Sequence, residues 1–87
     1  MRVTKEQVER LAKSRIEYDA AFDEAVLGEG PRKSHSQAVL SYESLKALAD
    51  AAGQRVAKRI GSKYVTWAFE LGGVEFFHIE ELEGGDA

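Results

Sequence analysis

Two histidines, His35 and His78, are the side chains of this 87-residue chain best suited to moving protons near neutral pH. His78 and Glu80 have the His-x-Glu spacing of one kind of zinc site, but such sites are completed by a pair of cysteines and the sequence contains none. His35 lies in a basic segment that is typical of a solvated loop. We therefore expect no catalytic residue, no metal site and no cofactor, and a structural role for His78 stacked near Trp67.

The glycine-rich segment 28–34 suits an anionic ligand. The segment runs into a predicted helix start, where free N–H groups favour negative charge. The segment lacks the spacing of a nucleotide-binding loop, and Pro31 removes one donor. An ordinary interhelical turn, with basic residues complementing a helix C-terminus, is the simpler interpretation. The possible contacts to a small anion or nucleic acid are Arg32, Lys33, Ser34, Arg55, Lys58, Arg59 and Lys63.

The charges are segregated along the chain, although the net charge is only −3. Residues 1–29 have five basic and seven acidic side chains, residues 30–64 have seven and two, and residues 65–87 have none and six. This pattern favours association between copies, a basic face for an anionic partner, or a solvated surface with accidental clustering. The acidic side chains that would engage a basic groove are Glu70, Glu75, Glu80, Glu81, Glu83 and Asp86.

Length and composition restrict the class of protein. A chain of 87 residues has room for one small core, and without cysteines no disulfide reinforces it, so self-association is the reinforcement that we expect. The sequence has no apolar leader and no run of about 18 apolar residues, which predicts a cytoplasmic protein with no membrane partner. It also has no internal repeat, low-complexity block or family signature.

The first element that must position these side chains is a helix predicted over about residues 4–27. Thr4 followed by Gln7 is a capping-box pattern at its start, and glycines with Pro31 end it. The apolar residues that fall on one side of the helical wheel are Val8, Leu11, Ala12, Tyr18, Phe22, Ala25 and Val26.

A second long helix is predicted over about residues 35–60, capped by Ser34 or Ser36. Gly53 would weaken or divide this helix, and Gly61 would end it. A four-residue connection favours antiparallel packing of the two helices as an αα-hairpin. The seam that would face the first helix consists of Ala38, Tyr42, Leu45, Ala49, Ala52, Val56 and Ile60.

Beyond the helices, apolar residues alternate with the period of a strand from Lys63 onwards. Gly72-Gly73 is typical of a two-residue turn, which would pair Leu71 with Val74. We predict a β-hairpin over about residues 63–82, followed by a disordered acidic tail over residues 83–87.

Both faces of this hairpin are apolar, and a one-residue slip would exchange the faces of its second strand. Two strands alone are marginally stable, so we expect the second face to be covered by another copy or another protein, or by the chain's own helix ends or tail. The face that would cover the helices holds Val65, Trp67, Phe69, Leu71, Val74 and Phe76. The second face, which we interpret as an interaction face, holds Tyr64, Thr66, Ala68, Phe77 and Ile79.

The sequence thus predicts a single α+β domain over residues 1–82, in which two long antiparallel helices precede a C-terminal two-stranded β-hairpin. The function it favours is a non-catalytic protein–protein interaction module that self-associates as a homodimer. Such a protein would be a small accessory or inhibitor protein, of a size and acidity that suit bacteria or phage, that occludes or bridges an unidentified protein partner. The alternative is binding of a small anionic ligand or nucleic acid through the basic segment 30–64.

Overall fold

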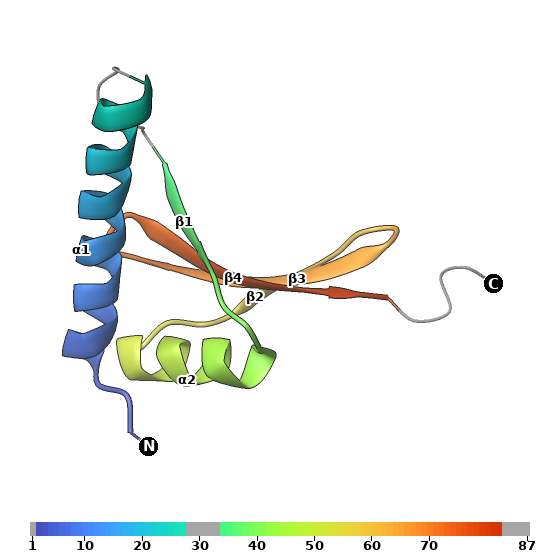
Figure 1. Cartoon of the computed structure of the whole chain (residues 1–87). Coiled ribbons are helices and arrows are strands. Elements are labelled where there is room, and N and C mark those ends of the chain that lie inside the picture. Colours follow the sequence, from blue (N-terminus) through green and yellow to red (C-terminus); the bar gives the residue numbers. More distant parts are fainter. Residues whose placement is uncertain (1, 28–33, 83–87) are drawn as a thin grey trace.

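The structure, a computed structural model, describes residues 2–27 and 34–82 of the chain. A four-stranded mixed sheet with the strand order β1-β4-β3-β2 has α1 and α2 packed on one of its faces (Figure 1). The elements in chain order are α1 (Lys5–Phe22), the π-helical turn η1 (Asp23–Leu27), β1 (His35–Ala38), α2 (Tyr42–Ala52), β2 (Ala57–Ile60), β3 (Tyr64–Leu71) and β4 (Val74–Glu81). β1 is parallel to β4, and β3 is antiparallel to both β4 and β2.

The prediction of two long antiparallel helices followed by a two-stranded hairpin is wrong. The predicted helix over residues 35–60 is replaced by β1, α2 and β2, and only 11 of its residues are helical. Ser41, rather than Ser34 or Ser36, caps α2, because its hydroxyl accepts a hydrogen bond from the Ser44 N–H at 3.1 Å. Gly53 ends α2 with a left-handed φ of 70°, a conformation that glycine adopts without a Cβ penalty.

The two short strands β1 and β2 lack the alternating apolar pattern of a half-buried strand. β1 is mostly polar, and every residue of β2 is exposed. Each strand is held by a neighbour, since β1 pairs with residues 74–77 and β2 with residues 65–68. The predicted helical seam holds only within α2, where Leu45, Ala49 and Ala52 are buried.

The first helix begins where the sequence predicts. The Gln7 N–H donates to the Thr4 hydroxyl at 3.2 Å, and the Thr4 N–H donates to the Gln7 side-chain oxygen at 2.9 Å, so the capping box is confirmed. α1 runs to Phe22 and η1 continues to Leu27, near the predicted end. The predicted glycine–proline stop at residues 28–31 and the predicted tail at residues 83–87 lie outside the described residues.

β3 and β4 form the predicted hairpin, and of the two registers that the sequence left open they have the one set by a two-residue turn. Leu71 pairs with Val74 across the turn. Gly72 and Gly73 have φ values of 62° and 82°, which a two-residue turn with two left-handed positions requires. The turn abuts α1, because a Cβ on Gly72 would lie 3.3 Å from the Ala12 Cβ.

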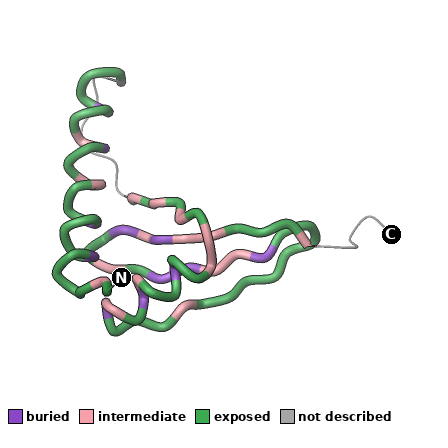
Figure 2. The backbone as a smooth tube through the Cα atoms, turned by 60° about the horizontal axis from the view of Figure 1, so that its bottom comes forward, coloured by how far each residue is buried: buried purple, intermediate pink, exposed green. Residues whose placement is uncertain are grey.

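The core lies between the two helices and one face of the sheet, and the buried stretches of backbone gather there (Figure 2). α2 lies near the N-terminal part of α1, and the C-terminal part of α1 extends past the sheet (Figure 1). No helix within the described residues has the length and apolar character needed to cross a bilayer. The buried core residues are Val8, Ala12, Leu45, Ala49, Ala52, Phe69, Val74 and Phe76.

Candidate functional site

The sheet face opposite α1 and α2 is not covered by any helix or strand of the described chain (Figure 1). Successive strand residues point to opposite faces, so every second residue of β3 and β4 points away from the core. The register pairs Thr66 with Ile79 and Ala68 with Phe77 on this uncovered side. All five residues of the predicted interaction face therefore lie together, and these residues, Tyr64, Thr66, Ala68, Phe77 and Ile79, form the open face.

The centre of the open face is apolar and accessible. Tyr64 and Ile79 are about half exposed, and Phe77 is partly exposed. Phe77 lies between two small neighbours, Ala68 on β3 and Ala38 on β1. Because these neighbours are small, the Phe77 ring is flanked by little bulk on either side, which leaves room for side chains of another molecule.

Acidic residues border this apolar centre. Glu70 and Glu75 face each other beside the hairpin turn, and Glu81 lies opposite Tyr64 at the other end. The Arg59 guanidinium lies 3.6 Å from the Glu75 carboxylate, an exposed ion pair of the kind that adds little stability. The border is therefore mainly negative, with one cation on β2.

The other members of the predicted acidic surface do not lie on the open face. Glu80 points to the helix-covered side, where its carboxylate lies 2.9 Å from His78 Nε2. Glu83 and Asp86 lie outside the described residues.

The basic residues predicted to contact an anion are dispersed. Lys58 and Arg59 are successive residues of β2, so they point to opposite faces, and the Lys58 ammonium lies 5.9 Å from the Trp67 ring centre. Arg59 and Lys63 line a shallow hollow at the β2–β3 turn, together with Tyr64. Of the remaining predicted contacts, Ser34 and Arg55 are exposed residues outside helices and strands, and Arg32 and Lys33 lie outside the described residues.

His78 has the predicted position beside Trp67, with the two rings stacked at a centre-to-centre distance of 6.0 Å. Its Nδ1 donates to the Val39 carbonyl at 2.8 Å, and the Tyr42 ring packs edge-on against Trp67. His78 thereby ties β4 to the segment that connects β1 with α2.

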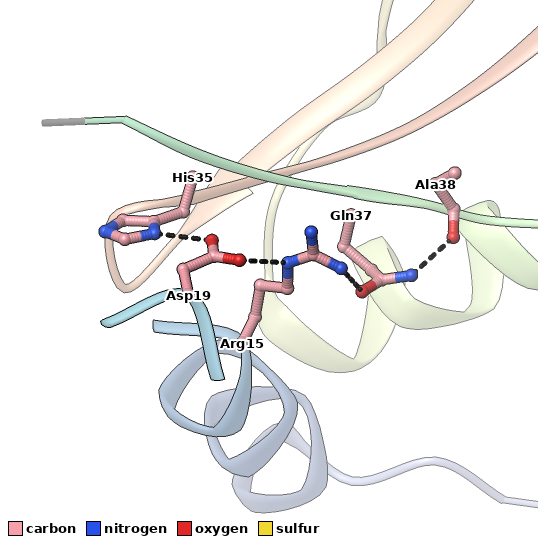
Figure 3. A network of polar contacts seen from close by, with 5 residues as sticks. All are labelled: Arg15, Asp19, His35, Gln37 and Ala38. Carbon is pink, nitrogen blue, oxygen red and sulfur yellow. Dashed lines mark hydrogen bonds and ion pairs between the residues drawn. The ribbon is translucent and has the colours of Figure 1, made fainter. Parts of the chain in front are cut away.

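A buried polar network joins α1 to β1, and the sequence did not predict it (Figure 3). Asp19 is only 1% exposed, and its carboxylate accepts a hydrogen bond from His35 Nδ1 at 2.7 Å. Arg15 Nε lies 3.2 Å from the other carboxylate oxygen as an ion pair without hydrogen-bond geometry, and Arg15 Nη1 donates to the Gln37 side chain at 3.1 Å. The one sequence signal for this network is the i,i+4 spacing of Arg15 and Asp19.

A carboxylate that orients a histidine is also part of many nucleophile–base arrangements, so the chemistry of this network has to be considered. The sequence has no cysteine, and two serines flank His35. Ser36 points to the opposite face of β1, and Ser34 is an exposed residue just before the strand. Within residues 2–27 and 34–82, no group of three or more histidine, aspartate or glutamate side chains is placed to hold a metal ion. The arrangement fits a structural role, in which the network holds β1 against α1.

No protein-family model, curated protein or solved structure matches the chain. The open face and its surroundings are therefore the evidence on function.

Proposed function

We propose that this domain is a non-catalytic protein–protein interaction module, which self-associates and holds a partner protein against the open face. The observation that carries the proposal is the apolar centre of that face, where Tyr64, Phe77 and Ile79 remain accessible while both helices pack on the other side. Transfer of such side chains out of water is favourable at about 25 cal/mol for each Å² of apolar surface. A contiguous apolar patch with a polar border is typical of protein interfaces.

The border of the open face indicates the chemistry of the partner. Glu70, Glu75 and Glu81 are acidic, so the complementary surface is an apolar patch flanked by lysines or arginines. Complementary charges of this kind raise the association rate and exclude acidic competitors. By covering such a patch on its partner, the domain would act as a small accessory or inhibitor protein.

Self-association is supported by the small core and by the separation of basic and acidic segments along the chain. A homodimer would present two open faces, so that it could bridge two partner molecules instead of only occluding one. Two linked sites also bind a divalent target more tightly than either site alone.

The substitution Ile79→Glu tests the open face. Ile79 is about half exposed and lies outside the core, so the variant is expected to fold. The new carboxylate would be buried without a partner against the apolar patch of the partner protein, and apolar contact would be lost. We expect its dissociation constant for the partner to rise at least about tenfold, as for a central interface residue. Proteins captured on the immobilised domain from its native cell would be purified and titrated calorimetrically against the wild type and the variant.

Ile60→Glu is the matched control, because Ile60 is more exposed than Ile79 and pairs with Val65, on the opposite face of the sheet. This control is expected to leave the affinity unchanged. Capture alone does not count as support. If every captured protein binds the wild type and Ile79→Glu equally well, the open face is not the partner site.

A further inference from the structure

The strand β2 leaves one edge of the sheet open. It is the last strand in the order β1-β4-β3-β2, and within the described residues its backbone lies beside β3 and no other helix or strand. All of its residues are exposed, and Ile60 is 71% exposed. An edge strand of this kind presents backbone N–H and C=O groups with which another strand can pair.

The register identifies the backbone groups of β2 that point outwards. The Gly61 N–H donates to the Tyr64 carbonyl at 2.8 Å, and hydrogen-bonded pairs alternate with non-hydrogen-bonded pairs along an antiparallel ladder. Arg59, two residues before Gly61, therefore bonds to β3. The N–H and C=O groups of the alternate residues, Lys58 and Ile60, point away from β3 and are open to an added strand.

The opposite edge of the sheet, formed by β1, is less open. α1 packs beside β1, and the Arg15 guanidinium donates to the Gln37 side chain. The same Gln37 side chain donates to the Ala38 carbonyl at 2.9 Å, so a side chain already occupies an acceptor of this strand. Of the two edges, β2 is therefore the more available for pairing.

The side chains around the β2 edge are basic. Residues 54–63 contain four basic side chains and no acidic one. Lys58 and Arg59 are successive strand residues, so one cation lies on each face of the edge. Arg59 and Lys63 also line the shallow hollow at the β2–β3 turn. An added strand would therefore meet positive charge on both of its faces.

The contacts that these cations already make leave them able to pair with a new carboxylate. The Arg59–Glu75 ion pair has a separation of 3.6 Å, and its side chains are 70% and 46% exposed, so solvent screens it. The Lys58 ammonium lies 5.9 Å from the Trp67 ring centre, and Lys58 is exposed. Neither contact buries the charge.

These charges distinguish another protein from a second copy as the partner. The antiparallel register that uses both outward residues of two β2 strands would set Arg59 directly opposite Arg59 of the second copy, and like charges in that position are destabilising. Among the described strands, the other edge strand, β1, has no acidic residue, and the acidic strand β4 lies inside the sheet. No described strand of a second copy therefore complements the β2 edge.

From the outward backbone groups and the basic side chains we infer that the β2 edge is the docking site for an extended acidic segment of another protein. The segment adds to the four-stranded sheet as a further strand, antiparallel to β2. Its residue opposite Ile60 is apolar, and the next two residues, opposite Arg59 and Lys58, are acidic. The inference goes beyond the proposed function and does not depend on it, because edge pairing uses β2 and not the apolar centre of the open face.

A fluorescently labelled synthetic peptide with a central Val-Glu-Glu-Val segment tests the charges of the edge. Anisotropy at low salt is expected to show saturable binding to the wild type, and a dissociation constant about tenfold higher for Lys58→Ala with Arg59→Ala, because two exposed ion pairs are lost. The control is Arg10→Ala with Lys13→Ala, which removes two exposed cations of α1 and is expected to bind like the wild type. Equal losses in the two double variants, or no binding by the wild type, would contradict the inference.

Methylation of the peptide backbone separates strand pairing from charge attraction. In the proposed register the N–H groups of the first valine and the second glutamate donate to β2, whereas those of the first glutamate and the second valine point away. N-methylation of the first pair is expected to abolish binding, and N-methylation of the second pair is expected to retain it. Equal binding by the two methylated peptides would overturn the added strand.

Hydrogen exchange locates the peptide on the sheet. The amides of Lys58 and Ile60 are expected to gain protection when the peptide binds, whereas the amide of Arg59, already paired with β3, is expected to change little. Phe77→Ala, on the open face, is expected to bind the peptide like the wild type, so failure of the open face as a partner site would not imitate failure of the edge. Protection that omits Lys58 and Ile60 would overturn the docking site.

Discussion

Replacing Phe76 by alanine is expected to destabilise the domain by about 3–5 kcal/mol, the range for truncation of a buried phenylalanine. The Phe76 ring is 1% exposed and stacks on Phe69 at a centre-to-centre distance of 5.1 Å, in the middle of the core. For a domain of this length the expected loss is a large fraction of the total unfolding free energy. Urea unfolding followed by circular dichroism measures the change.

Its neighbour Phe77 provides the matched control. Phe77 is partly exposed on the open face, so Phe77→Ala is expected to lose less than half as much stability and to weaken partner binding instead. The two phenylalanines are adjacent in the sequence, and a one-residue slip of β4 would exchange their positions. A larger loss of stability for Phe77→Ala than for Phe76→Ala would therefore contradict the register and the assignment of the open face.

Replacing Asp19 by alanine is expected to destabilise the domain by about 1–3 kcal/mol, the range for leaving a buried donor without its partner. The variant leaves the buried Nδ1 donor of His35 without its acceptor, and it removes the carboxylate that pairs with Arg15. As a result, the contact between β1 and α1 would be weakened. Urea unfolding measures the loss, and hydrogen exchange at residues 35–38 locates it.

Asp50→Ala is the control for this prediction. Asp50 also pairs with a basic residue four positions away, and its hydrogen bond raises the pKa of Lys46, but both side chains are exposed. Solvent screens such pairs, so we expect little change in stability. If Asp19→Ala were as mild as Asp50→Ala, the buried network would not be holding β1 in place.

The hairpin and the open face could be predicted from the sequence because their signals are local. Alternation from Lys63 predicts strands, and Gly72-Gly73 predicts a two-residue turn. The sequence left a one-residue slip open, and the structure has the register of the two-residue turn for every pair from Tyr64 to Glu81. Once the register is known, the side on which Phe77 and Ile79 lie follows from geometry alone. The residues that share the open face could therefore be listed without the rest of the fold.

The second half of the helical prediction failed because the decisive interactions are not local. The residues of β1 and β2 have no strand pattern of their own, and each becomes a strand by pairing with β4 or β3. The apolar spacing of α2 continues by coincidence to Val56 and Ile60, past the point where Gly53 ends the helix. Pairing between distant segments overrides weak local propensity in such cases.

The buried network was missed for a related reason. His35 follows basic residues in the sequence, which is typical of an exposed loop, yet the pairing of β1 with β4 brings it onto Asp19. The same pairing places Ser36 and Ala38 on the open face, which widens that face beyond the hairpin. Neither result follows from local spacing, because both depend on an edge strand that the sequence alone does not predict.

The solution mass of the wild-type chain, measured by light scattering over a concentration series at low and high salt, tests the proposed self-association most directly. We expect a reversible dimer with twice the mass of one chain, which weakens at high salt because salt screens the attraction between the basic and acidic segments of two copies. The mass of a single chain at every concentration and at both salt levels would contradict the proposal.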